Sequence, residues 1–208
     1  RYYRLALQRE LPVRDEQLVR INLACSLNGV GEHRQALEEL DRVSLPELYP
    51  NEVALWLNNR AYTLTFLGRP ADAIDNLKDT DELLAGDDGL SRDPLLSGCI
   101  AGTRGIAHFH LGELEAAERC LRDALKKEEE GVALQFDPEW HTDPARTSER
   151  WFWLGEISKR QGDEAEATRR YQRAAAHSGT EYGEKAQKLL KAMKAAENPP
   201  RRLILTSA

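Results

Sequence analysis

Apolar side chains recur along the chain at the three-to-four-residue spacing of amphipathic helices. Between Trp151 and Ala174 a Gly-Asp pair interrupts that spacing, which predicts two short helices joined by a tight turn. The same frame occurs three times upstream, with an alanine five positions after each turn glycine. The turn glycines are Gly31, Gly68, Gly112 and Gly162. The pattern therefore predicts four helical hairpins.

The frame also repeats the residue sizes that two close helices need. The residue seven positions before each turn glycine is small, namely Ala24, Ala61, Gly105 and Gly155. The residue nine positions after it is large, namely Leu40, Leu77, Leu121 and Tyr171. Helices approach closely where one has little side chain and a large residue of the other fills the gap. One hairpin cannot bury its apolar face alone, so the hairpins are expected to stack.

The last hairpin resembles the tetratricopeptide repeat, whose pattern is W-x2-L-G followed by Ala, an aromatic residue and Ala. The residues that carry the resemblance are Trp151, Leu154, Gly155, Ala167, Tyr171 and Ala174. The resemblance extends over about residues 16–176. It implies an all-α fold, a right-handed superhelix (α-solenoid) of tetratricopeptide-like helical hairpins with a C-terminal capping helix.

Proline and glycine breaks predict the boundaries of these segments. Residues 1–12 are expected to be the end of an upstream repeat, and the absence of an initial methionine suggests a piece of a longer protein. Four helix pairs are expected at 13–44, 51–85, 93–131 and 143–177. A capping helix is expected at 179–198 and a tail at 199–208.

Several helix ends are predicted from individual residues. Asp15, Asn51, Asp93 and Asp143 are expected to stand at helix starts, the last two directly before a proline. Residues 1–11 and 70–84 are each expected to form one helix. Gly131 is expected to end the second helix of the third pair.

Composition limits the classes of function. The net charge is −6 and the pI about 5.5, so the chain has no electrostatic reason to bind nucleic acid or an anionic membrane. No apolar run approaches the ~20 residues of a membrane span, so no direct membrane insertion is expected. Cys25, Cys99 and Cys120 form no C-x2-C pair, which favours a reducing, cytoplasmic compartment. The targeting of a longer parent protein would not be visible here.

No set of residues has the spacing of a catalytic or metal site, so we predict no enzyme, no cofactor and no metal. His108 and His110 lie roughly 200° apart around a helix and cannot face one ion. His141, with Glu139 and Asp143, lies in the long loop at 132–143 but lacks any H-x3-H or C-x2-C support. The Asp-Asp-Gly run at 87–89 lacks the frame of a calcium loop.

The resemblance further implies that the first helix of each hairpin lines a concave groove. The expected groove residues are Leu55, Asn58, Asn59, Tyr62, Phe66, Gly102, Ile106, Phe109, His110, Phe152, Glu156 and Lys159. The glycines Gly98, Gly102 and Gly105 are expected either to allow close helix–helix approach or to leave open space in a binding groove, and Gly102 is the better candidate for open space. Some members of the family hold the C-terminal carboxylate of chaperones with a Lys/Asn/Arg clamp. Only Asn59 fits that clamp here, which disfavours this kind of partner.

These observations predict a protein–protein interaction scaffold that binds a partner peptide or helix in the concave groove. Two alternatives stay open. The first is a structural module that self-associates into a homo-oligomer. The second is a regulatory sensor domain of a larger protein, membrane-anchored or not, in which the loop at 132–143 binds a small ligand or an ion.

Overall fold

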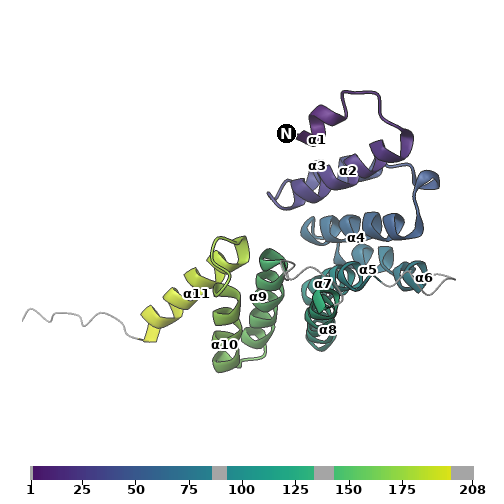
Figure 1. The fold of residues 1–208 in the computed structure, drawn as a ribbon. Coiled ribbons are helices and arrows are strands. Elements are labelled where there is room, and N and C mark those ends of the chain that lie inside the picture. Colours follow the sequence, from purple (N-terminus) through teal and green to yellow (C-terminus); the bar gives the residue numbers. More distant parts are fainter. Residues whose placement is uncertain (1, 86–92, 134–142, 198–208) are drawn as a thin grey trace, which may run out of the picture. The chain divides into compact units, whose positions relative to one another are not determined.

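The protein is described by a computed structural model that places residues 2–85, 93–133 and 143–197. These residues form helices and no β-strand, which confirms the expected all-α class over the described part (Figure 1). The chain divides into two compact units, residues 1–142 and 143–208. The loop at 86–89, Glu139, His141 and the tail at 199–208 lie outside the described residues.

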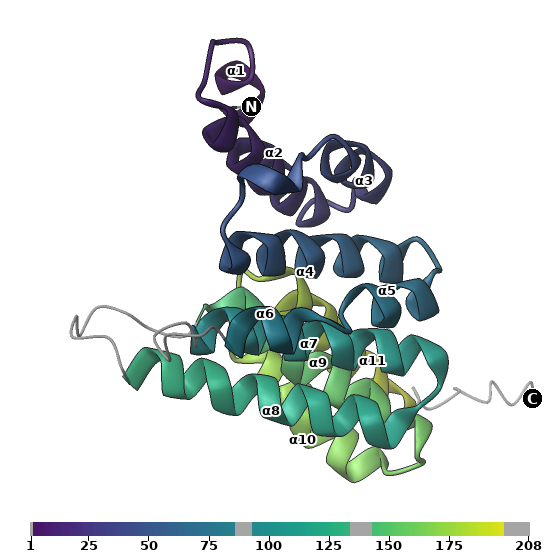
Figure 2. The ribbon, with the colours of Figure 1, turned by 90° about the vertical axis from the view of Figure 1, so that its right-hand side faces the viewer.

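The first unit is a succession of antiparallel helices that pack pair by pair. Helix α2 packs against α3, α4 against α5 and α6, and α7 against α8, while α4 and α5 also contact α7 (Figure 2). The helices are α1 (Tyr2–Ala6), α2 (Val13–Asn28), α3 (His33–Asp41), α4 (Pro50–Phe66), α5 (Pro70–Asn76), α6 (Thr80–Ala85), α7 (Pro94–Leu111) and α8 (Leu114–Ala133). A short 3₁₀ helix, Leu45–Glu47, precedes α4.

The second unit contains three helices, α9 (Pro144–Arg160), α10 (Glu164–Ala175) and α11 (Glu181–Glu197). Helix α10 packs against both α9 and α11, and α11 also contacts α9. Helix α11 lies where the capping helix was expected. Its buried residues Tyr182 and Ala186 face these neighbours, whereas its lysines are exposed.

Each of the four predicted turn glycines has a left-handed backbone. The φ angles of Gly31, Gly68, Gly112 and Gly162 are 80°, 79°, 81° and 81°. A residue with a Cβ atom is strained in this region, which is why glycine stands at the end of each first helix. The prediction of four hairpin turns is therefore confirmed.

Helices α7 and α8 pack closely because α7 has glycines on the face it turns toward α8. A Cβ atom added to Gly105 would lie 2.8 Å from Cγ of Leu121, and one added to Gly98 would lie 2.9 Å from Cγ of Glu128. In the second unit a Cβ atom on Gly155 would lie 2.5 Å from the Tyr171 ring. The close approach predicted from residue sizes is thus confirmed for both pairs.

Gly131 has a different role from the one expected. Helix α8 continues through it to Ala133, so Gly131 does not end the helix. A Cβ atom there would lie 2.7 Å from Cδ2 of Leu95, at the start of α7. Because Gly131 has no side chain, α7 can approach α8 closely at this point. The glycine therefore serves helix packing here and does not form a turn.

The helix starts are confirmed at two positions and wrong at two others. Asp93 accepts hydrogen bonds from the N–H groups of Leu95 and Leu96, and Asp143 accepts one from Ala145. Helices α2 and α4 begin earlier than Asp15 and Asn51 predicted.

The reason for the early starts is proline. Helix α4 begins at Pro50, whose fixed φ suits a first helical position, and α2 begins directly after Pro12. At the N-terminus, α1 ends at Ala6 and does not continue to residue 11.

The single helix expected at 70–84 is interrupted between α5 and α6. The hydroxyl of Thr80 donates to the Leu77 carbonyl at 2.8 Å, and Arg104 Nη2 on α7 donates to the same oxygen at 3.2 Å. The backbone N–H of Thr80 also donates a hydrogen bond to the Leu77 carbonyl, three residues back. These donors replace the helical partner of the Leu77 carbonyl, so the helix can break without leaving a buried acceptor unpaired.

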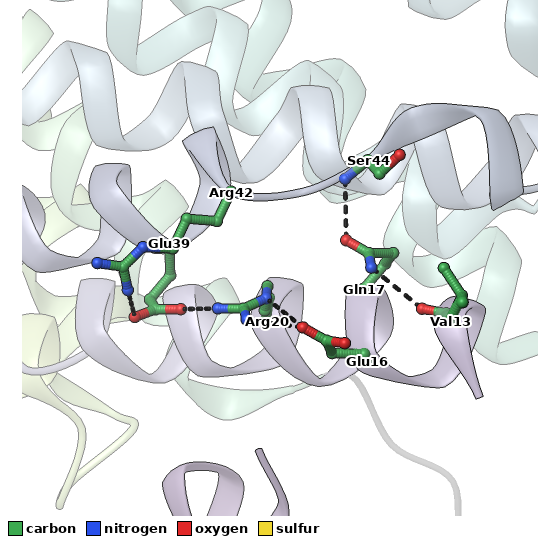
Figure 3. Close-up of polar contacts among 7 residues, drawn as sticks. All are labelled: Val13, Glu16, Gln17, Arg20, Glu39, Arg42 and Ser44. Carbon is green, nitrogen blue, oxygen red and sulfur yellow. Dashed lines mark hydrogen bonds and ion pairs between the residues drawn. The ribbon is translucent and has the colours of Figure 1, made fainter. Parts of the chain in front are cut away.

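Polar side chains fasten α2 to α3 and to the chain that follows (Figure 3). Arg20 bonds Glu16 at 2.7 Å on its own helix and Glu39 at 2.9 Å on α3. The buried Gln17 donates to the Val13 carbonyl at 3.1 Å and accepts from the N–H of Ser44 at 2.9 Å. Gln17 therefore holds the exit from α3 against the first turn of α2.

The contact of α7 with α8 gives a prediction about stability. Gly105→Ala should lower the free energy of unfolding of the first unit by about 1–3 kcal/mol, because the added methyl group overlaps Leu121 and the backbone oxygen of Ala117. Gly29→Ala is the matched control, since φ there is −64° and the nearest atom is 3.6 Å away. Urea unfolding followed by circular dichroism measures both; equal effects would contradict the packing account.

Candidate functional site

A stripe of side chains along one side of α4 contains five of the expected groove residues. Leu55, Tyr62 and Phe66 are linked through Asn58 and Asn59 by steps of three or four residues, so the five lie on one side of the helix, with the adjacent Asn58 and Asn59 setting the width of the stripe. Asn59 is buried and its side-chain amide donates to the Leu55 carbonyl at 3.0 Å. The other four are partly exposed. The structure thus brings these five residues together along one side of α4.

Four rings from three elements meet at the end of this stripe, and we call His33, Tyr62, Phe66 and His110 the aromatic cluster. His33 stacks on Phe66 with 5.1 Å between centroids and 13° between planes. Tyr62 lies 4.7 Å from Phe66, and His110 meets Phe66 edge-on at 5.9 Å. Phe66 is the shared member. His110 is exposed and the other three are partly exposed.

Polar groups lie beneath the aromatic cluster. His33 Nδ1 is 3.1 Å from Oδ1 of the buried Asn28 at the end of α2. Asn28 Nδ2 donates to the hydroxyl of Thr63 at 2.9 Å, and that hydroxyl donates to the Asn59 carbonyl at 2.7 Å. This network connects the turn after α2 to α4, and so it holds His33 in place against Phe66.

The fully charged side chains of α4 and α7 are bonded to other elements. Arg60 contacts Asp41 and Asn76, and Arg104 contacts α6. Glu52 accepts from Arg14 on α2 and from the N–H of Tyr49, and the hydrogen bond with Arg14 lowers the pKa of this carboxyl. The stripe and the aromatic cluster therefore offer aromatic rings, amides and imidazoles, and none of these three ions.

Three expected groove residues on α7 are buried. Ile106 is 0% and Phe109 2% exposed, and Gly102 is also buried. The open space expected at Gly102 is therefore absent, and the two large side chains cannot serve as exposed anchors. Helix α7 packs against α4, α5 and α8, which leaves little of its surface uncovered. Only His110, at the end of α7, is exposed among the four.

The three expected groove residues on α9 are placed differently from one another. Phe152 is buried and its ring lies 5.1 Å from Tyr182 on α11. Glu156 accepts a hydrogen bond from the hydroxyl of Tyr171 at 2.6 Å, so it already has an internal partner. Burial and this hydrogen bond raise the pKa of Tyr171. Lys159 is exposed.

His33 is the member of the aromatic cluster that sequence reasoning missed. The available signal was an imidazole two positions after the turn glycine Gly31, where the other hairpins have Pro70, Leu114 and Glu164. Its stacking on Phe66 depends on how α3 approaches α4, which the spacing of residues does not specify.

The residues that the structure describes, 2–85, 93–133 and 143–197, also bear on metal binding and on membrane insertion. Over these ranges, no three side chains of His, Cys, Asp or Glu gather closely enough to hold a metal ion. Within the same part of the chain, no helix combines the length and the hydropathy needed to cross a membrane.

A comparison with protein families supports the tetratricopeptide resemblance. Residues 101–123 match the family model described as "Tetratricopeptide repeat". The matched segment runs from the middle of α7 through the turn at Gly112 into α8, and it includes Gly105, Ala117 and Leu121. No curated protein matches the chain.

The internal bond of Glu156 gives a second prediction. Tyr171→Phe should lower the free energy of unfolding of the second unit by about 1–3 kcal/mol, because it removes a hydrogen bond to a carboxylate and leaves the ring in place. In the control background Glu156→Gln, the same change should cost less. Thermal unfolding of the four variants in a double-mutant cycle measures the coupling, and additive effects would show that the bond contributes nothing.

Proposed function

We propose that this chain is a protein-interaction scaffold that binds a partner segment on the aromatic cluster and the adjoining stripe of α4. The observation that carries the proposal is that the rings of His33, Tyr62 and His110 all contact Phe66, with His110 exposed and the other three rings partly exposed. Clustered aromatic side chains supply large contact areas at small entropic cost, and such residues often dominate binding at interfaces. The tetratricopeptide repeat is in general a non-enzymatic protein-interaction fold, which agrees with this use.

The partner segment should be apolar or aromatic and largely uncharged. Arg60 and Arg104 bond other helices, and Glu52 bonds Arg14, so these ions do not face a ligand on the stripe. An unpaired charge on the partner would lose water at the cluster without gaining an opposite charge from these three residues. Leu55 and Asn58 would extend the contact along α4 toward its start.

The proposal includes the superhelical arrangement that the resemblance implies. Stacked helical hairpins generate an extended surface on the side of their first helices, and α4 and α7 are such first helices. In the first unit the successive pairs α2–α3, α4–α5 and α7–α8 contact one another, which supports a stack. A solenoid that buries its second helices against the next pair would leave the α4 stripe facing the groove.

Peptide selection tests this proposal. A displayed library of random peptides selected on the immobilised chain should yield apolar, aromatic-rich sequences, and binding of a selected peptide can be measured by fluorescence anisotropy. Phe66→Asp should weaken that binding by at least about 2 kcal/mol, roughly thirtyfold, because it removes the central ring. Phe66→Ala should act in the same direction with less disturbance of the helix.

Val30→Asp is the matched control, because Val30 is an exposed apolar residue in the turn after α2 and lies outside the aromatic cluster. It should bind as the wild type does. Circular dichroism checks that each variant keeps its helicity. Equal binding by Phe66→Asp and the wild type would contradict the proposal. A mass that grows with concentration in light scattering, without peptide binding, would favour the self-associating module.

A further inference from the structure

The hydrogen bonds beneath the aromatic cluster have a defined direction. The Asn59 carbonyl oxygen can only accept, and Thr63 Oγ1 lies 2.7 Å from it, so the hydroxyl proton is donated there. Thr63 Oγ1 then has only lone pairs for Asn28. Asn28 Nδ2 lies 2.9 Å from Thr63 Oγ1 and Oδ1 lies 3.1 Å from it. The nitrogen is the closer atom and the only donor, so it makes the bond.

The reverse orientation of the Asn28 amide is unfavourable. It would place the amide oxygen 2.9 Å from a hydroxyl oxygen whose proton is already used. It would also place that oxygen 3.5 Å from the Asn59 carbonyl oxygen. Three acceptors would then face one another in a buried site, which is costly. Asn28 is 7% exposed, so water cannot easily relieve the conflict.

The orientation of Asn28 assigns the proton of His33. Asn28 Oδ1 can only accept, and His33 Nδ1 lies 3.1 Å from it, so Nδ1 must carry a proton. The hydrogen bond made by one ring nitrogen determines the tautomer of the neutral ring. We propose that Asn28 holds His33 as the Nδ1–H tautomer, that Nε2 takes the second proton when the pH falls, and that this protonation weakens binding at the aromatic cluster. The binding part rests on the proposed function.

The charge matters because of where the ring lies. His33 is partly buried and stacks on Phe66, so a segment that covers Phe66 also covers the imidazole. A neutral imidazole loses water at modest cost, whereas an imidazolium against an apolar partner loses much more hydration. Histidines ordinarily change charge near pH 6.5, so the effect falls in mildly acidic conditions.

The groups that contact or flank His33 include neutral side chains and a pair of opposite charge. Helix α2 contributes the neutral Asn28, and α4 contributes Phe66 and Tyr62, whose class titrates only near pH 10. On the element of His33 itself, the flanking residues are Glu32 and Arg34, of opposite charge, and Gln35 donates to Glu32.

His110 of α7 needs separate treatment, because it also touches Phe66 and is also an imidazole that can take up a proton. The two histidines contact Phe66 differently, His33 face to face and His110 by an edge. His33 additionally contacts Asn28 through Nδ1. A variant of each histidine therefore separates their contributions.

The tautomer can be measured on the chain without a partner. Long-range ¹H–¹⁵N NMR spectra at pH 8 should show the Nδ1–H pattern for His33, assigned by its loss in His33→Gln. Asn28→Ala should abolish that preference while the pattern of His177, in the second unit, stays unchanged. An Nε2–H pattern in the wild type, or no change in Asn28→Ala, would overturn the assignment.

The pH dependence is measured with a selected peptide that contains no His, Asp or Glu. Its dissociation constant should rise about fivefold between pH 7.5 and pH 5.5, because the free chain binds protons that the complex must release. His110→Gln should retain a rise, and His33→Gln should bind equally at both pH values. A rise that persists in His33→Gln, or that His110→Gln alone removes, would overturn the inference and leave the proposed function intact.

The assignment of the His33 tautomer can also hold when the proposed function fails. If no peptide binds, or if binding ignores Phe66→Asp, the proposed function and the binding part of the inference both fail. The NMR result would still decide whether Asn28 holds the tautomer of His33.

Discussion

Close contact between paired helices is the constraint on which the rest of this structure depends. Gly105 and Gly155 stand where a Cβ atom would overlap Leu121 and Tyr171, so each pair can approach only because one helix lacks side chain there. The left-handed glycine between the two helices reverses the chain within a few residues. Together these features make the hairpin the unit of the fold, and the buried alanines such as Ala117 and Ala167 complete the contact.

Close packing also explains why hydrogen bonds from polar side chains connect the helices at several points. When helices nest tightly, the remaining gaps are small, and backbone groups in them need exact partners. Arg104 supplies one at the break between α5 and α6, and Gln17 supplies another at the exit from α3. The Asn28–Thr63 pair has the same structural role between α2 and α4, and its direction additionally controls the chemistry of His33.

The aromatic cluster is what remains at the surface after this packing is complete. Helix α7 is so apolar and so well covered that Ile106 and Phe109 are used inside the unit. Phe152 is used in the same way in the second unit, against Tyr182. Tyr62, Phe66 and His33 keep part of their rings exposed, since they lie where the end of α4 meets the start of α3. The candidate surface is therefore smaller and more local than a groove along the whole chain.

The sequence alone determined the helical class, the four turns and the caps at Asp93 and Asp143, because each of these depends on residues within a few positions of one another. Such local signals were weaker where a distant group intervened. At the break after Asn76 the Leu77 carbonyl accepts from the nearby Thr80 and also from Arg104, twenty-seven residues beyond Leu77, and no local pattern contains this second donor.

Which aromatic residues are buried and which stay exposed was decided only by the tertiary structure. Phe66 and Phe109 both lie in the last turn of a first helix, two and three positions before the turn glycine, and one is partly exposed whereas the other is 2% exposed. The difference arises from which neighbouring helices cover each ring. Helical spacing tells which residues share a face, whereas the covering of that face depends on contacts between segments far apart in the chain.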